Sequence, residues 1–293
     1  MSSHLLTFPA MHPGESLYSI VSRYHVLIGH RIHITTIREL YERPFDLRLL
    51  FALPCKVNCF RSWLPGRLGI TPEMITTRHT AWNYASLAPQ FDSAVLERLA
   101  SVKSSRGPGK RKALMKCLLD TTITIRFCPQ CANEEKQKYR EPYWHTLHTL
   151  KGIRYCPVHR KPLQEIMTSD TSSLNRFITA EELMQGQCDN YREIASDNTS
   201  SEKEHLRLAE LVNQILTADD AKIAELRKWL KKAENQKTGS ILETIRNFGG
   251  DDFFRSIWTS DELMVRSELI EQNGIRALEP LEAAMFLYQS RCL

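Results

Sequence analysis

The chain has 293 residues, of which 42% are apolar and 25% are charged. This composition is typical of soluble globular proteins and excludes disordered and fibrous classes. No apolar run approaches the roughly 18 residues of a membrane span, and the first residues lack the regions of a signal peptide. Eight cysteines in this length are too few for a disulfide scaffold. We therefore expect a cytoplasmic protein with reduced thiols and no membrane partner.

The charge is unevenly distributed along the chain. Residues 1–167 contain 24 Lys and Arg against 12 Asp and Glu, a net charge of +12, whereas residues 168–293 contain 15 against 22, a net charge of −7. This split predicts a basic part that contacts double-stranded DNA and an acidic part that does not. The alternative is two unrelated solvated surfaces.

The N-terminal region has a helical pattern. From Glu15 to Ile28 the apolar residues fall on one helical stripe, with Pro13 and Gly14 before it and Gly29 as the stop. This pattern predicts a helix with one apolar face, which lies against the core, and one polar face.

A second helix is expected around residues 37–41. Thr35 or Thr36 can serve as its N-cap, and Pro44 should end it because proline lacks the backbone N–H that a helix needs. Further on, a helix, a turn at 66–69 and a new helix capped by Thr71 are compatible with a helix-turn-helix. A plain pair of packed helices has the same pattern.

Residues 95–102 predict another helix, and the Ser, Gly and Pro residues that follow predict an exposed loop. Between positions 103 and 116 there are six basic residues and no acidic one. The residues that we expect to contact DNA phosphates are Lys103, Arg106, Lys110, Arg111 and Lys112. The alternative is a loop that is merely solvated.

The strongest chemical signal is a pair of short cysteine motifs. Cys128-Pro-Gln-Cys131 is followed, after 24 residues, by Cys156-Pro-Val-His159. Two residues between ligands let both side chains of a pair face one point from a tight turn. Three thiolates and one imidazole form a closed tetrahedral site, which is typical of a single structural Zn²⁺. A redox role is the alternative, but the second pair ends in His and no thioredoxin-like pattern surrounds it.

Two further histidines allow a different ligand set. His145 and His148 could complete a classical finger with the first cysteine pair, since 13 residues separate Cys131 from His145. That set would leave the second pair unused. We therefore expect both histidines to be ordinary core or surface residues near the site, where one of them could be hydrogen-bonded to a ligand. Tyr143 and Trp144 are expected to be core aromatics.

These patterns predict a mainly α fold with a small zinc-finger subdomain. The expected parts are a helical N-terminal part at 1–120, the zinc-finger subdomain at 121–167, a linker at 168–201 and an acidic helical domain at 202–293. A short strand over 121–127 should lead into the first cysteine pair.

The start of the chain, FPAMHPGESLYSIVSRYH, together with the later FCPQC, YW and YCPVHRKPL, resembles the TniQ family of bacterial transposon proteins. TnsD-type target-site selectors belong to this family. The resemblance covers residues 8–167 and implies a helix-turn-helix, a zinc finger and a role without catalysis. That role is to mark the insertion site and recruit an AAA+ ATPase, TnsC, which engages the transposase. Carried over to this chain, the zinc ligands would be Cys128, Cys131, Cys156 and His159.

This chain departs from some family members, because no second cysteine-rich finger follows the first. In this respect it looks more like TnsD than like the short members that act with CRISPR effector complexes. The sequence leaves open whether the target is read directly or through such an RNA-guided complex. It also leaves open whether the chain is a short member or part of a longer one.

Two other functions remain open beside the adaptor. One is a zinc-stapled nuclease with His145 as the base, and the other is a zinc-containing transcription regulator. Nothing in the sequence resembles GxxxxGK[ST], HExxH or GxSxG, so we expect no enzyme.

The partner that the resemblance implies makes the first helix a candidate contact. Its polar face carries Glu15, Ser19, Ser22 and Arg23. Arg23 is the residue that we expect to bind the ATPase, because arginine is favoured at interface centres. It could instead brace Glu15 or Glu39 within the domain.

Overall fold

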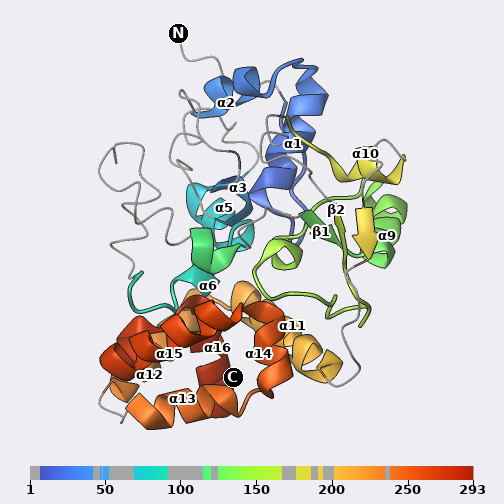
Figure 1. The fold of residues 1–293 in the computed structure, drawn as a ribbon. Helices are drawn as coiled ribbons and strands as arrows, with labels where there is room; N and C mark the ends of the chain where they lie inside the picture. The colour runs from blue at the N-terminus through green and yellow to red at the C-terminus, as the bar shows by residue number, and fades with distance from the viewer. Residues whose placement is uncertain are drawn as a thin grey trace.

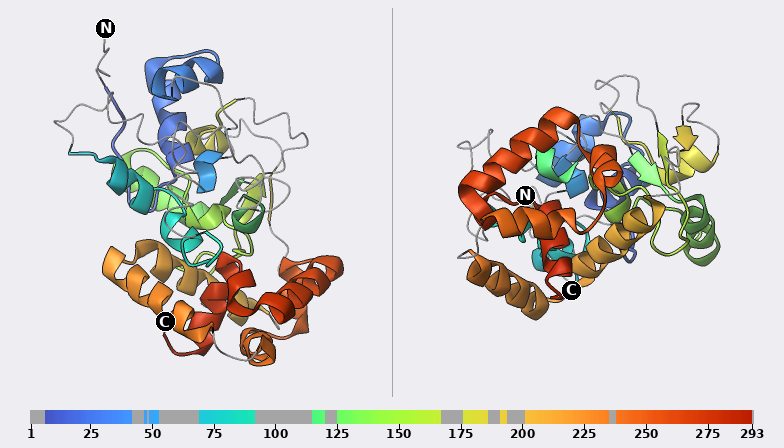
Figure 2. Two further views of the ribbon diagram at one scale, coloured as in Figure 1. Left: turned by 90° about the vertical axis from the view of Figure 1, so that its left-hand side faces the viewer. Right: turned by 60° about the horizontal axis from the view of Figure 1, so that its bottom comes forward.

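The computed structural model describes residues 7–41, 47, 49–52, 69–91, 115–119, 125–166, 176–185, 191–193, 201–234 and 238–292. Figure 1 shows a mainly helical protein with one small sheet, which confirms the predicted fold class. The N-terminal helices lie at one end and the C-terminal helices at the other, as the left view of Figure 2 also shows. Within the described part, no helix combines the length and the apolar character that crossing a membrane requires.

The first helix, α1 (Leu17–Ile28), is the one that the sequence predicts. Ser16 is its N-cap and accepts a hydrogen bond from the backbone N–H of Ser19 at 3.2 Å. Gly29 ends it in the left-handed region, with φ of 73°, which glycine adopts without steric cost.

The polar face of α1 is buried as well as its apolar face. Tyr18, Ser19 and Ser22 are all buried, so this part of the helix is covered on every side. Val26 and Leu27, near its end, are 58% and 53% exposed. The first two turns of α1 therefore cross the core, and only the last turn reaches the surface.

The second helix, α2 (His33–Tyr41), begins before Thr35 and Thr36, so neither threonine is its N-cap. The hydroxyl of Thr36 is used elsewhere, since it is hydrogen-bonded to Nδ1 of His25 at 2.7 Å and to Nδ1 of His30 at 2.8 Å. This contact ties α2 to the end of α1. A one-turn helix, α3 (Leu49–Ala52), follows.

Helix α5 (Pro72–Arg78) confirms the predicted capping, because Thr71 accepts from the N–H of Met74 at 3.1 Å and proline takes the first position. A short helix, α6 (Trp82–Ala85), comes next. The helix expected before α5, most of the turn between them, and the helix expected over 95–102 lie outside the described residues. The helix-turn-helix therefore stays a prediction.

The sheet has three antiparallel strands in the order β1 (Ile125–Phe127), β2 (Gln164–Ile166) and β3 (Tyr191–Glu193). The strand predicted over 121–127 thus appears in its last three residues, and 120–124 lie outside the described part. Between β1 and β2 lie α9 (Pro129–Tyr139) and the 3₁₀ turn η2 (Leu147–Thr149).

The interval 168–201, for which a linker is expected, contributes two elements to the fold. One is strand β3, and the other is helix α10 (Ala180–Met184), which Thr179 caps. Just before α10, the backbone oxygen of Ile178 accepts from the indole N–H of Trp144 at 2.8 Å. Residues just before and within α10, namely Phe177, Ile178 and Leu183, therefore belong to the core.

The C-terminal part is helical, as predicted. Its elements are α11 (Glu202–Thr217), α12 (Asp220–Ala233), α13 (Thr238–Arg246), α14 (Asp251–Ile257), α15 (Ser260–Asn273), the 3₁₀ turn η4 (Gly274–Ala277) and α16 (Pro280–Gln289). Most of α16 is buried among the others, and α11 packs on α5 and α6. One continuous apolar cluster runs from α1 to α16, so the described parts share a core.

Candidate metal centre

The first cysteine pair lies at the start of a helix. Cys128 is the N-cap of α9, Pro129 takes the first helical position, and Cys131 lies in the first turn. The spacing predicts a tight turn at this pair, whereas the structure has the start of a helix. A helix start suits thiolates, because the free N–H groups and the helix dipole place positive charge there.

The second pair forms a tight turn of the expected kind. The N–H of Cys156 donates to the backbone oxygen of Lys161 at 2.9 Å, and the N–H of Arg160 donates to the oxygen of Cys156 at 2.8 Å. Arg160 adopts the left-handed φ of 54° that this reversal needs. The N–H of His159 points at the sulfur of Cys156, 3.5 Å away. The turn thus presents one sulfur and one imidazole on the same side.

The fold brings the four residues of the two pairs together as a group that could hold a metal ion. Nδ1 of His159 lies 3.5 Å from the sulfur of Cys128, 3.3 Å from that of Cys131 and 3.6 Å from that of Cys156. The sulfurs of Cys131 and Cys156 are 3.6 Å apart. Tetrahedral zinc, with bonds of about 2.3 Å to sulfur and about 2.0 Å to nitrogen, gives edges of about 3.5–3.8 Å. The donor set and its spacing therefore fit Zn²⁺.

Electrostatics also favour a cation between these groups. Hydrogen bonds with Cys128 and Cys156, together with burial, raise the pKa of Cys131 far above its usual range. Hydrogen bonds from Cys128 and Cys131 lower the pKa of Cys156. Three neighbouring thiolates repel one another unless a cation lies between them. A bound dication would remove this repulsion and let all three thiols ionise.

Two residues outside the group hold the ligands in place. Glu134 is hydrogen-bonded to Nε2 of His159 at 2.9 Å, which turns Nδ1 of that ring towards the sulfurs. His148 is buried, with 2% of its surface exposed, and its hydrogen bond with Cys156 favours the thiolate form of that cysteine. Glu134 is not among the residues predicted from the sequence. Recognising Pro129 as a helix start would have revealed it, since position 134 lies one turn beyond Cys131.

His145 lies beside the group but outside it. Its Nε2 is hydrogen-bonded to Glu135, whose other carboxylate oxygen accepts from the N–H of Tyr143 at 3.1 Å. Cys131, Glu135 and His145 form a second, smaller group that could hold a metal ion. Tyr143 and Trp144 are buried in the core, as predicted.

The N-terminal segment is bonded directly to the region of the metal centre. The N–H of Thr146 donates to the backbone oxygen of Gly14 at 3.0 Å, and the N–H of Ser16 donates to the oxygen of Trp144 at 2.8 Å. The N–H of Trp144 in turn donates to the hydroxyl of Ser19 at 3.1 Å. The two halves of the sequence signature are therefore one structural unit.

Arg23 takes part in the same junction. It is 9% exposed and donates to Glu15 on its own segment and to Glu141, just after the end of α9. It also donates to the backbone oxygen of Ala10 at 2.8 Å. Arg23 is thus buried between two carboxylates, and the alternative that it braces Glu15 matches these contacts. Its role in binding a partner stays a prediction.

The five basic residues expected to contact DNA, Lys103, Arg106, Lys110, Arg111 and Lys112, lie outside the described residues. Their position relative to the metal centre is therefore not described.

Comparison with known families decides the assignment. The TniQ family model matches residues 6–163, more than half of the chain. The chain belongs to the TniQ family. A search among curated proteins gives no match. The TniQ match runs from the segment before Gly14 to the turn after His159, and so contains both sides of the junction. Membership of this family associates the chain with transposition in general.

Proposed function

We propose that this TniQ protein is a DNA-binding adaptor of a bacterial transposon, which marks the insertion site and recruits an AAA+ ATPase of the TnsC type. The transposase is then engaged through the ATPase. The observation that carries the proposal is the TniQ match across residues 6–163, which includes both the N-terminal segment and the metal centre. The proposed adaptor is not an enzyme, since its chemistry resides in the proteins that it brings together.

The proposed metal is one structural Zn²⁺, held by Cys128, Cys131, Cys156 and His159. Four protein ligands leave no open position for water or substrate, which is the mark of a structural site. When bound, zinc supplies a rigid cross-link, and its binding free energy adds to the stability of the fold. The cross-link joins the start of α9 to the turn at 156–161 and so supports the junction with α1.

DNA binding is assigned to the basic half of the chain, with the loop at 103–112 as the proposed phosphate contact. The test is to replace Lys110, Arg111 and Lys112 together by Ala and to measure DNA affinity over a range of salt concentrations. Each lost phosphate contact flattens the plot of log affinity against log salt by about 0.9, so the slope should fall by about 2.7. An unchanged slope would rule out this loop as a DNA contact.

ATPase recruitment needs a separate experiment. The chain and the ATPase of the same transposon are mixed with target DNA, and the amount of ATPase that sediments with the DNA is measured. The adaptor should increase that amount. DNA binding without recruitment supports the transcription regulator instead, and Mg²⁺-dependent nicking of plasmid DNA supports the nuclease. If recruitment occurs only when an RNA-guided CRISPR effector complex is added, that complex reads the target.

A further inference from the structure

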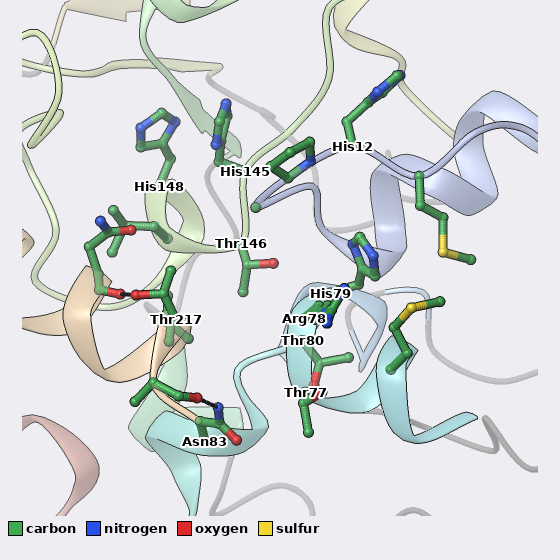
Figure 3. A pocket seen from close by; sticks show the side chains of 18 of the residues that line it. His12, Thr77, Arg78, His79, Thr80, Asn83, His145, Thr146, His148 and Thr217 are labelled. Atoms are coloured by element: carbon green, nitrogen blue, oxygen red, sulfur yellow. Dashed lines mark hydrogen bonds between the residues drawn. The ribbon is translucent and has the colours of Figure 1, made fainter. Parts of the chain in front are cut away.

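A cleft of about 1010 Å³ lies where the parts of the chain meet. Its walls come from the N-terminal segment before α1, from α5 and α6, from the metal centre and from the junction of α11 and α12. Figure 3 shows His79 and Thr77 on one side of the open space, Thr217 on the other and Thr146 between them. The volume lies at the upper end of the range for small-molecule pockets, so there is room for several residues of a peptide.

Two threonine hydroxyls that line the cleft, one on α5 and one on α11, already donate within their own helices. The hydroxyl of Thr77 donates to the backbone oxygen of Glu73 at 2.9 Å, and that of Thr217 donates to the oxygen of Asn213 at 2.8 Å. Each hydroxyl hydrogen is therefore occupied within its own helix. The oxygen of each threonine hydroxyl can therefore accept a hydrogen bond from a molecule bound in the cleft.

Two buried residues that line the cleft also use a donor within the protein and keep an acceptor. Asn83 donates from Nδ2 to the backbone oxygen of Ala218 at 3.0 Å, which leaves its carbonyl oxygen as an acceptor. Nδ1 of His79 donates to the backbone oxygen of Glu15 at 2.8 Å, since a carbonyl oxygen can only accept. Burial lowers the pKa of His79, which favours the neutral ring, and in a neutral ring that donates from Nδ1 the Nε2 atom is an acceptor.

The charged side chains that line the cleft also favour a positively charged ligand. Asp219 and Asp220 line the cleft at the start of α12, and both are exposed. Asp219 uses one carboxylate oxygen to cap α12, accepting from the N–H of Lys222 at 2.7 Å. Arg78 is the one lysine or arginine among the described residues that line the cleft. The cleft therefore offers two carboxylates and several neutral acceptors against one fixed positive charge.

Apolar side chains line the rest of the cleft. Met11 and Met74 come from two different walls, and Leu216 lies between the polar residues of α11. Val158, in the turn of the metal centre, is 71% exposed at the edge. Unbranched methionines adapt their shape to different apolar partners and are common on protein-binding surfaces.

We infer that this cleft binds an arginine side chain, flanked by apolar residues, on a segment of a partner protein. Arginine carries five N–H donors and no acceptor, which matches the acceptor atoms of Thr77, Thr217, Asn83 and His79 and the carboxylates of Asp219 and Asp220. The unpartnered hydroxyl of Thr146 can accept as well as donate. The inference rests on the proposed function in that it assigns the adaptor a protein-binding cleft. Because the metal centre forms one wall, loss of the metal would also disturb the cleft.

The experiment uses the full chain labelled with ¹³C at the methionine methyl groups and observed by NMR. Met11 and Met74 report on the cleft, and Met264, which is 58% exposed on α15, serves as the internal control. The probes are the capped tripeptides Leu-Arg-Leu, Leu-citrulline-Leu and Leu-Glu-Leu. Citrulline has nearly the shape of arginine without its charge. The arginine peptide should shift the methyl signals of Met11 and Met74 but not that of Met264, and it should bind more tightly than the other two.

Substitutions that remove a negative or a positive charge from the cleft should change the affinity for the arginine peptide in opposite directions. Asp219→Asn and Asp220→Asn should each weaken binding of the arginine peptide, and Arg78→Ala should tighten it, by about two- to fivefold in each case. Glu271→Gln removes one exposed charge from α15, away from the cleft, and should change nothing. Tighter binding of the glutamate peptide, or weaker binding of the arginine peptide by Arg78→Ala, would overturn the inference. If no peptide binds while ATPase recruitment to DNA persists, the cleft assignment fails and the adaptor function stands.

Discussion

Arg23 donates from Nη1 to both carboxylate oxygens of Glu15, at 2.9 Å each, and Glu15 has no exposed surface. The carboxylate also accepts from the backbone N–H of His12 at 3.0 Å. A carboxylate so enclosed stays charged at low cost only while its partners remain. This pair therefore fixes the path of the chain before α1.

Replacing Arg23 by Ala should destabilise the protein strongly. It leaves the buried carboxylate of Glu15 without its cation, and removing one partner of a buried ion pair costs about 3–5 kcal/mol. Chemical denaturation measures the loss, with Arg38→Ala, an exposed arginine on α2, as the control, expected within about 0.5 kcal/mol of the wild type. If Arg23→Ala keeps full stability but loses ATPase recruitment, Arg23 is a partner contact after all.

Glu141 should contribute to stability in a pH-dependent way. Partial burial raises its pKa, but hydrogen bonds from Arg23 and His12 outweigh this and leave the pKa below the ordinary 4.5. A carboxyl whose pKa is lower in the folded state stabilises the fold above its unfolded pKa and loses this effect as the pH falls. Since the side chain is 40% exposed, the contribution at pH 7 should stay below about 1 kcal/mol.

The measurement is the unfolding free energy of the wild type and of Glu141→Gln between pH 7 and pH 3. The variant should be less stable at pH 7, and the difference should shrink as the pH falls below about 4.5. A difference that grows towards low pH would contradict the assigned direction.

The purified protein should contain one zinc per chain, measured by elemental analysis. Cys131→Ser and His159→Ala should lose the metal and unfold the region around it, because structural zinc adds its binding free energy to folding. His145→Ala is the control and should keep the metal. Full zinc in Cys156→Ser together with none in His145→Ala would show that the ligand set is wrong.

Two glycines should respond oppositely to replacement by alanine. Gly14 has φ of +71°, and an added Cβ would lie 3.4 Å from Nδ1 of His145, so Gly14→Ala should cost about 1–2 kcal/mol. Gly239 lies in α13 with open space around it, so Gly239→Ala should add about 0.4–1 kcal/mol. Thermal denaturation of both variants checks this, and equal effects would show that the turn at Gly14 carries no strain.

The features predicted from the sequence are those that local chemistry decides. The cap at Thr71 and the stop at Gly29 depend on a few neighbouring residues, and both were predicted along with α5 and α1. The grouping of Cys128 with its three partners also follows from spacing, since each pair brings two ligands together within one turn.

The environment of Arg23 could not be read in the same way. Its partner Glu141 is 118 residues away, and nothing in the helical pattern indicates that a second segment covers that face of α1. For the same reason the cleft, whose walls come from four separate parts of the chain, had no signal in the sequence.

The hydrogen bond from the N–H of Ile178 to the hydroxyl of Tyr18 joins residues 160 positions apart. At the usual rate of about 5–20 residues per second, a ribosome needs about 8–30 s to make the chain between them. During this time α1 has left the ribosome while Ile178, which covers Tyr18, is still unmade. In a fragment that ends before Ile178, the side of α1 that this residue covers in the full chain is exposed to water. Dividing the chain near position 120 therefore separates parts of one folding unit.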